Sequence, residues 1–142
     1  MDKDLYHKLV FVRFKKYFPN TSEEEINEYF KLNEKEKLFC EYCGIELLPN
    51  TKYPYEQAPS LDRKLPESRK GKNEFDNIAI TCTQCNIVKG TMLSETYLKM
   101  LKLLSVDKEA SFRIRDEIFL GRKAYMLERK RNNTPKRLFE YV

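Results

Sequence analysis

Residues 60–89 contain two strand-like segments, SLDRK at 60–64 and NIAIT at 77–81, and then CTQCNIVK at 82–89. Isoleucines alternate along the second segment, which is typical of a strand with one buried face. The connection between the two segments is polar and basic, as in a surface loop. Gly90 follows the last segment and favours the end of a helix there. The sequence therefore predicts a β-hairpin that leads into a short helix.

All four cysteines of the chain fall in two Cys-x-x-Cys pairs, separated by 38 residues. Glycine follows the first pair directly, as in a zinc knuckle, where it takes a backbone angle that other residues resist. Two close pairs of thiolates suit one tetrahedral zinc ion, and redox chemistry explains two pairs less well. We expect a structural zinc site formed by Cys40, Cys43, Cys82 and Cys85.

An acid and an amide lie beside the second cysteine pair. Asp62 offers a hard carboxylate oxygen, and Asn86 offers an amide oxygen at the start of the helix that Cys85 would anchor. Oxygen ligands of this kind suit Mg²⁺ or Mn²⁺. Two protein ligands would leave positions on the ion for water and phosphate, which suits phosphodiester hydrolysis.

These motifs resemble the HNH endonucleases, whose fold is the ββα-metal motif. The family pattern has Asp-His on the first strand, Asn at the start of the second, and Cys-x-x-Cys followed directly by His or Asn. Here Asp62-Arg63, Asn77 and Asn86 occupy these places in order, and the upstream cysteine pair matches the zinc-bearing members. The resemblance covers roughly residues 38–95. It implies that Asp62 and Asn86 bind the catalytic metal ion and that Asn77 orients the catalytic loop.

Arg63 departs from the family pattern, which has a histidine general base at this position. Arginine stays protonated and cannot accept a proton from water, but it can bind phosphate or stabilise transition-state charge. Tyr53 or Tyr55 could serve as base or nucleophile, or both could pack on the loop or stack on nucleotides. Metal-bound hydroxide without a protein base is an equal alternative, and the remaining candidates are Glu56, Glu67 and His7.

Basic residues gather in the hairpin loop and near the C-terminus. The chain has 27 Lys and Arg against 22 Asp and Glu, a net charge of +5, which is consistent with a polyanionic partner. From residue 121 onward it has seven basic and two acidic residues, which could also serve only solvation. We expect contacts to a nucleic-acid backbone from Lys64, Arg69, Lys70, Lys72, Lys89, Arg129, Lys130 and Arg131.

Helices are expected on both sides of the hairpin. Helical spacing predicts one helix over residues 4–17, and a capping box at Ser22 opens a second. Ser94 and Asp107 are candidate caps of two later helices, the last of which Gly121 would break.

The predicted fold is α+β, with a small ββα-metal, treble-clef-like zinc core between helical flanks. The expected units are an N-terminal helical segment (1–37), a zinc-stabilised HNH-like nuclease core (38–105) and a C-terminal basic helical segment (106–142).

No apolar run approaches the roughly 20 residues of a membrane span, and the N-terminus lacks the pattern of a secretory signal. We therefore expect a cytoplasmic protein with reduced thiols and no membrane partner. The leading interpretation is an endonuclease acting on double-stranded DNA, for which a homodimer would suit double-strand cleavage. The alternative is a non-cutting zinc module that only binds nucleic acid. Arg63 favours that alternative, whereas Asp62 and Asn86 favour the enzyme.

Overall fold

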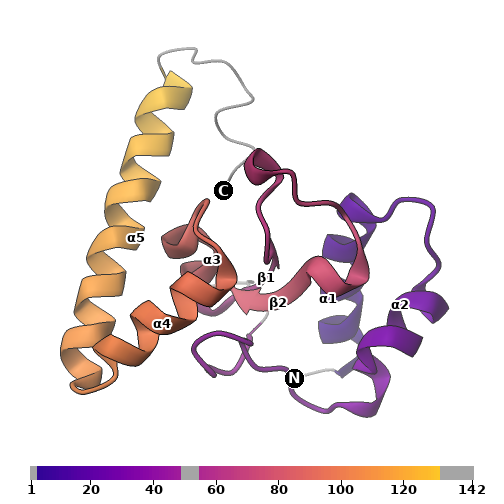
Figure 1. Cartoon of the computed structure of the whole chain (residues 1–142). Helices are drawn as coiled ribbons and strands as arrows, with labels where there is room; N and C mark the ends of the chain where they lie inside the picture. Colours follow the sequence, from indigo (N-terminus) through magenta and orange to yellow (C-terminus); the bar gives the residue numbers. More distant parts are fainter. Residues whose placement is uncertain (1–2, 49–54, 132–142) are drawn as a thin grey trace.

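The computed structural model describes residues 3–48 and 55–131, with the backbone alone for residues 3–6, 55 and 129–131. A small two-stranded antiparallel sheet lies at the centre of the fold, between two groups of helices (Figure 1). Short 3₁₀ turns connect several of the elements. The helices and strands are α1 (Lys3–Tyr17), α2 (Glu23–Phe30), β1 (Pro59–Arg63), β2 (Ile78–Cys82), α3 (Thr83–Lys89), α4 (Ser94–Leu104) and α5 (Lys108–Arg131).

The N-terminal helices form as predicted and pack beside the sheet. The side chain of Ser22 accepts a hydrogen bond from the backbone N–H of Glu25 at 3.2 Å, which confirms the predicted cap of α2. Phe14 of α1 is fully buried, and its ring lies 4.8 Å from that of Phe30. Helix α1 also contacts β1, so this face of the sheet is covered.

The predicted hairpin and the helix after it are confirmed, with the strands shifted by one residue. Strands β1 and β2 pair with Asp62 opposite Ala79. Cys82 ends β2 and caps α3, because its sulfur accepts a hydrogen bond from the Cys85 N–H at 3.3 Å. Gly90 ends α3 with a φ of +55°. The chain thus turns from the hairpin directly into a helix held at both ends.

The last helix differs from the prediction at Gly121. Helix α5 runs without interruption through this residue, so the expected break is wrong. Asp107 does cap α5, since its carboxylate accepts from the N–H of Ala110 at 3.1 Å. Ser94 is not a cap, because it is the first residue of α4 and follows the N-cap Leu93. Arg122 of α5 donates to the carbonyl of Ile87 at 3.1 Å, which fixes α5 against α3.

One hydrophobic cluster connects the flanks and the sheet. It includes Phe14 of α1, Ile80 of β2 and Phe119 of α5. Among residues 3–48 and 55–131, no helix is both long enough and apolar enough to cross a membrane. The structure is therefore a mixed helical fold with a small antiparallel sheet, in which α1 and α3 lie against the strands.

Candidate active site and metal centre

The four cysteines come together beside the hairpin. Their sulfur atoms all lie within 4.8 Å of one another, and the Sγ atoms of Cys43 and Cys82 are 3.8 Å apart. A tetrahedral zinc ion with Zn–S bonds of about 2.3 Å would hold its sulfurs about 3.8 Å apart. The donor set and the spacing therefore fit one zinc ion at Cys40, Cys43, Cys82 and Cys85.

Backbone geometry prepares the first cysteine pair. Gly44 has a φ of +78°, and its N–H donates to the carbonyl of Cys40 at 3.0 Å, which closes the knuckle turn. The N–H groups of Tyr42 and Cys43 point at the sulfur of Cys40, at 3.4 and 3.5 Å. The Glu41 N–H donates to a carbonyl of β2, so the knuckle is tied to the sheet.

The thiols of this cluster interact strongly with one another. Hydrogen bonds from Cys40, Cys82 and Cys85 lower the pKa of the Cys43 thiol. The contacts with Cys40 and Cys43 raise the pKa of the Cys82 and Cys85 thiols. A metal ion binds the thiolate form of cysteine. Metal binding would therefore replace the hydrogen bonds among the thiols by four charged thiolate ligands.

Asp62 lies almost completely buried between β1 and α3, with 5% of its surface exposed. Its Oδ2 atom accepts a hydrogen bond from the Tyr42 hydroxyl at 2.6 Å and lies 3.0 Å from the Lys89 ammonium. Burial raises the pKa of Asp62, and its contacts with Tyr42 and Lys89 oppose that shift. Lys89 has a completely buried side chain and is not available to a phosphate group. This corrects the expectation that Lys89 contacts nucleic acid.

Asn86 and Lys89 lie three residues apart on the same face of α3, and both approach β1. Its Nδ2 donates to the Ser60 hydroxyl at 2.7 Å and to the Leu61 carbonyl at 3.2 Å. Neither bond uses the amide oxygen, which is the atom of Asn86 that could bind a metal ion. The structure thus places Asp62 and Asn86 at the same interface between β1 and α3.

Arg63 lies on the other side of the strand, since successive side chains of a strand alternate. Its guanidinium carbon is 4.6 Å from the ring centroid of Tyr17 in α1. Its Nε donates to Asn73 at 2.6 Å, and Nη1 lies 3.8 Å from the Glu67 carboxylate. None of these contacts joins the guanidinium of Arg63 to the carboxylate of Asp62, although the charge of Arg63 opposes the rise in the Asp62 pKa that burial causes.

Asn77 holds the loop that follows β1. Its Oδ1 accepts from the Leu65 N–H at 2.8 Å, while Nδ2 donates to the carbonyls of Leu65 and Lys72, at 3.1 and 2.9 Å. Gly71 allows this close turn, because a Cβ there would lie 1.6 Å from the Leu65 carbonyl oxygen. The loop presents three exposed basic side chains, and Lys64 at its start is half-buried. The exposed ones are Arg69, Lys70 and Lys72.

Comparison with known families identifies this region. Residues 40–91 match the family model described as HNH endonuclease. The chain carries an HNH domain. The match includes both cysteine pairs, Asp62, Asn77 and Asn86. No curated protein and no solved structure matches the chain.

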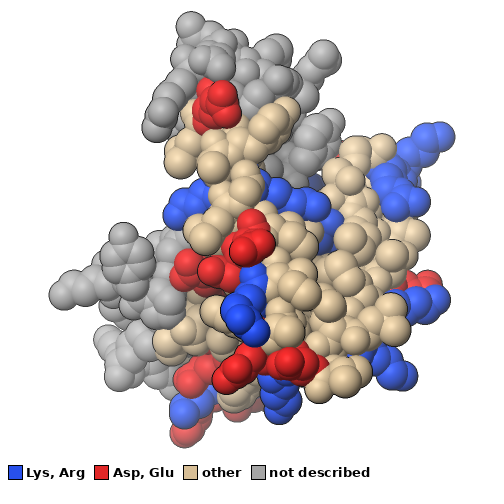
Figure 2. Space-filling view, turned by 90° about the vertical axis from the view of Figure 1, so that its left-hand side faces the viewer, with Lys and Arg blue, Asp and Glu red and all other residues tan. Residues whose placement is uncertain are grey.

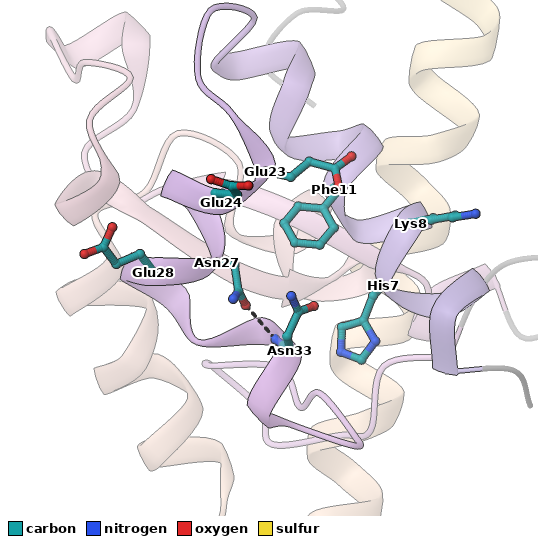
Figure 3. Close-up of a pocket in the computed structure, with 8 residues that line it drawn as sticks. All are labelled: His7, Lys8, Phe11, Glu23, Glu24, Asn27, Glu28 and Asn33. Carbon is teal, nitrogen blue, oxygen red and sulfur yellow. Dashed lines mark hydrogen bonds between the residues drawn. The ribbon is translucent and has the colours of Figure 1, made fainter.

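Several residues considered as general bases lie away from this centre of the HNH domain or outside the described residues. His7 is buried in α1, and its Nε2 donates to the carbonyls of Leu32 and Lys35 at 2.8 and 3.1 Å. It lines a hollow of about 750 Å³ together with three glutamates of α2, as Figure 3 shows. Tyr53 lies outside the described residues, as do the side chains of Tyr55, Arg129, Lys130 and Arg131.

Two residues of the HNH domain were missed by sequence reasoning. Tyr42 stands inside the first cysteine pair, and Lys89 was taken for a surface contact. Burial and the charge of Asp62 raise the pKa of the Tyr42 phenol, so Tyr42 acts as a hydrogen-bond donor rather than as a base. One signal in the sequence could have placed Lys89 at the site. Lys89 lies three residues after Asn86, and residues three apart on a helix share a face.

Proposed function

We propose that this protein is a metal-dependent endonuclease that hydrolyses phosphodiester bonds in DNA through its HNH domain. The observation that carries the proposal is that Asp62 of β1 and Asn86 of α3 lie at one interface, and that α3 is capped by Cys82 of the cysteine cluster. In the proposed ββα-metal, treble-clef arrangement, zinc has a structural role because its four thiolate positions leave none open for substrate.

The oxygen atoms of Asp62 and Asn86 would hold the catalytic Mg²⁺ or Mn²⁺. The two oxygens of Asp62 are engaged unequally, since Oδ2 is held by Tyr42 and Lys89 while Oδ1 lies 3.4 Å from the Lys89 ammonium. Oδ2 can therefore keep the carboxylate in place while Oδ1 serves as a ligand. When bound, such an ion supplies neutralisation of negative charge on the phosphate.

The remaining residues of the proposed site position the substrate. Asn77 orders the loop whose basic side chains would contact the DNA backbone. Arg63 is 20% exposed and retains its charge at any physiological pH, so we assign it a phosphate contact at the rim. Tyr53 and Tyr55 stay candidates for the base. Double-stranded DNA is the proposed substrate, and a homodimer would supply one active site for each strand.

The C-terminal residues Arg129, Lys130 and Arg131 are proposed as further backbone contacts at the end of α5. Figure 2 views the molecule from the side of α5 and shows basic and acidic side chains interspersed on that face. No broad surface of a single charge is visible on that face. We therefore assign the contacts with the DNA backbone to the hairpin loop and to the end of α5.

A second candidate is a non-cutting module that only binds nucleic acid. The buried ion pair favours it, because Lys89 already neutralises the carboxylate that a divalent ion would need. The contact of Arg63 with Tyr17 also favours it, since a packed arginine has a structural role. The amide oxygen of Asn86 and the less engaged oxygen of Asp62 favour the enzyme.

Cleavage of supercoiled plasmid distinguishes the two candidates. Purified protein is incubated with Mg²⁺, Mn²⁺ or EDTA, beside N86A, D62A and the control D76N, which changes an exposed acid of the same domain. We expect metal-dependent nicking or linearisation that falls at least 100-fold in N86A and D62A and persists in D76N. Zinc content and circular dichroism verify that the variants fold. DNA binding without cleavage of either plasmid or mixed genomic DNA would select the non-cutting module.

A further inference from the structure

Two buried hydrogen-bond donors without a protein partner line a cavity beside the cysteine cluster. Within the described part of the chain, the buried side-chain atoms that lack a partner are Thr81 Oγ1, Gln84 Nε2, Tyr97 Oη and Arg115 Nε. Gln84 and Arg115 line a cavity of about 560 Å³ together with Cys43 and Cys82. Buried polar groups are usually satisfied, so two unsatisfied donors in one cavity indicate a partner other than the protein's ordinary acceptors.

The zinc-loaded cluster has the chemistry of that partner. Four thiolates around one divalent ion leave an excess of negative charge, and Cys40, Cys82 and Cys85 are buried. Buried negative charge is stable only where donors or cations face it. Residues that contact metal ligands also fix the position and basicity of those ligands.

Arg115 comes from α5 and is the one cationic side chain among the described residues that line the cavity; Glu56 and Asp116 are its acidic lining. The Nε atom of Arg115 is buried without a hydrogen-bond partner among residues 3–48 and 55–131, and Cys43 and Cys82 line the same cavity. Gln84 belongs to α3, between the two cysteines of the second pair. The guanidinium therefore faces the cluster from one helix and the amide faces it from another.

Tyr97 of α4 supplies a donor from a third helix. Its side chain is fully buried, and its ring lies 5.3 Å from that of Tyr42 in the zinc knuckle. The Tyr97 hydroxyl is buried and has no hydrogen-bond partner among the described residues, so it can donate to a thiolate of the zinc-loaded cluster.

We propose that Arg115 and Tyr97 are positioning residues of the metal centre, which donate to the thiolates of the zinc-loaded cluster and compensate their charge. Zinc retention then depends on α4 and α5, although all four ligands lie outside these helices. Conversely, the docking of α5 depends on zinc. Because α5 carries the basic residues at positions 129–131, zinc loading sets the position of this basic end. The proposal needs the four-cysteine zinc site and does not depend on nuclease activity.

Zinc affinity of purified full-length variants tests the proposal by competition with a chromophoric chelator. R115M should lower the affinity at least 10-fold, R115K should recover part of the loss, and Y97F should lower it several-fold. The matched control is R113M, which removes an exposed arginine of the same helix and should leave the affinity unchanged. In the Co²⁺-substituted protein, R115M should also shift the thiolate charge-transfer band, because a cation no longer faces the sulfurs.

Wild-type zinc affinity and an unshifted cobalt spectrum in folded R115M would overturn the proposal. If R115M does not fold, R115K and Y97F decide the matter, since each keeps most of the buried volume. Unchanged affinity in both of these variants would overturn it equally.

Discussion

Replacing Lys89 by methionine should lower the free energy of unfolding by about 3–5 kcal/mol, the usual cost of removing one partner of a buried ion pair. Methionine keeps most of the aliphatic stem, so the change removes mainly the ammonium group. The Lys89 side chain is 0% exposed and Asp62 is 5% exposed, so water cannot replace that group. The Tyr42 hydroxyl remains as a donor to Asp62 and places the loss toward the lower end of the range.

Urea unfolding at neutral pH with saturating zinc measures this loss. The chain offers a matched control in K99M, because Lys99 lies 3.4 Å from Glu95 but both side chains are more than two-thirds exposed. An exposed pair of this kind contributes roughly 0–1 kcal/mol. In the double variant D62N/K89M the two losses should not add, since neither charge is left alone. A loss below about 1 kcal/mol in K89M, with zinc content intact, would refute the closed ion pair.

Two further predictions concern the loop after β1. The variant N77A removes the amide group that binds the backbone of Leu65 and Lys72. It should lower the free energy of unfolding by urea by about 1–3 kcal/mol and make the loop more sensitive to proteolysis. A loop as resistant to protease as in the wild type would contradict this role of Asn77. Replacing Arg69, Lys70 and Lys72 by glutamine should leave stability unchanged, weaken DNA binding and reduce the slope of log affinity against log salt by up to about 3. An unchanged slope would remove these side chains from the interface.

The four-cysteine cluster and the hairpin could be predicted because their signals are local. Each cysteine pair needs only a tight turn, and Gly44 supplies its unusual backbone angle at the first. The cap at Ser22 and the end of α3 at Gly90 depend on neighbours within one helical turn. Such features survive in any tertiary context that keeps the element intact.

Features decided by tertiary contacts could not be predicted in this way. The sequence does not reveal that α1 places Tyr17 under Arg63, or that Lys89 turns inward to meet Asp62. The sequence predicts a helix break at Gly121, because glycine in a helix interior lowers helix stability by about 1 kcal/mol relative to alanine. The helix continues there because tertiary contacts flank the glycine: Phe119 is buried in the core, and Arg122 donates to the Ile87 carbonyl of α3.

The cysteine cluster and the Asp62 carboxylate are connected at two points, so the proposed structural zinc ion would have a consequence for the proposed catalysis. Tyr42 lies between Cys40 and Cys43 of the cysteine cluster and donates to Asp62, so the knuckle turn sets the direction of that bond. Lys89 lies on the helix that Cys82 caps, so the second pair sets its approach to the same carboxylate. Loss of zinc would therefore release both hydrogen-bond partners of the Asp62 carboxylate. Burial already raises the pKa of this group. A protonated Asp62 is a poor ligand for a hard cation, so losing the structural ion should disable the catalytic ion's site before the domain unfolds.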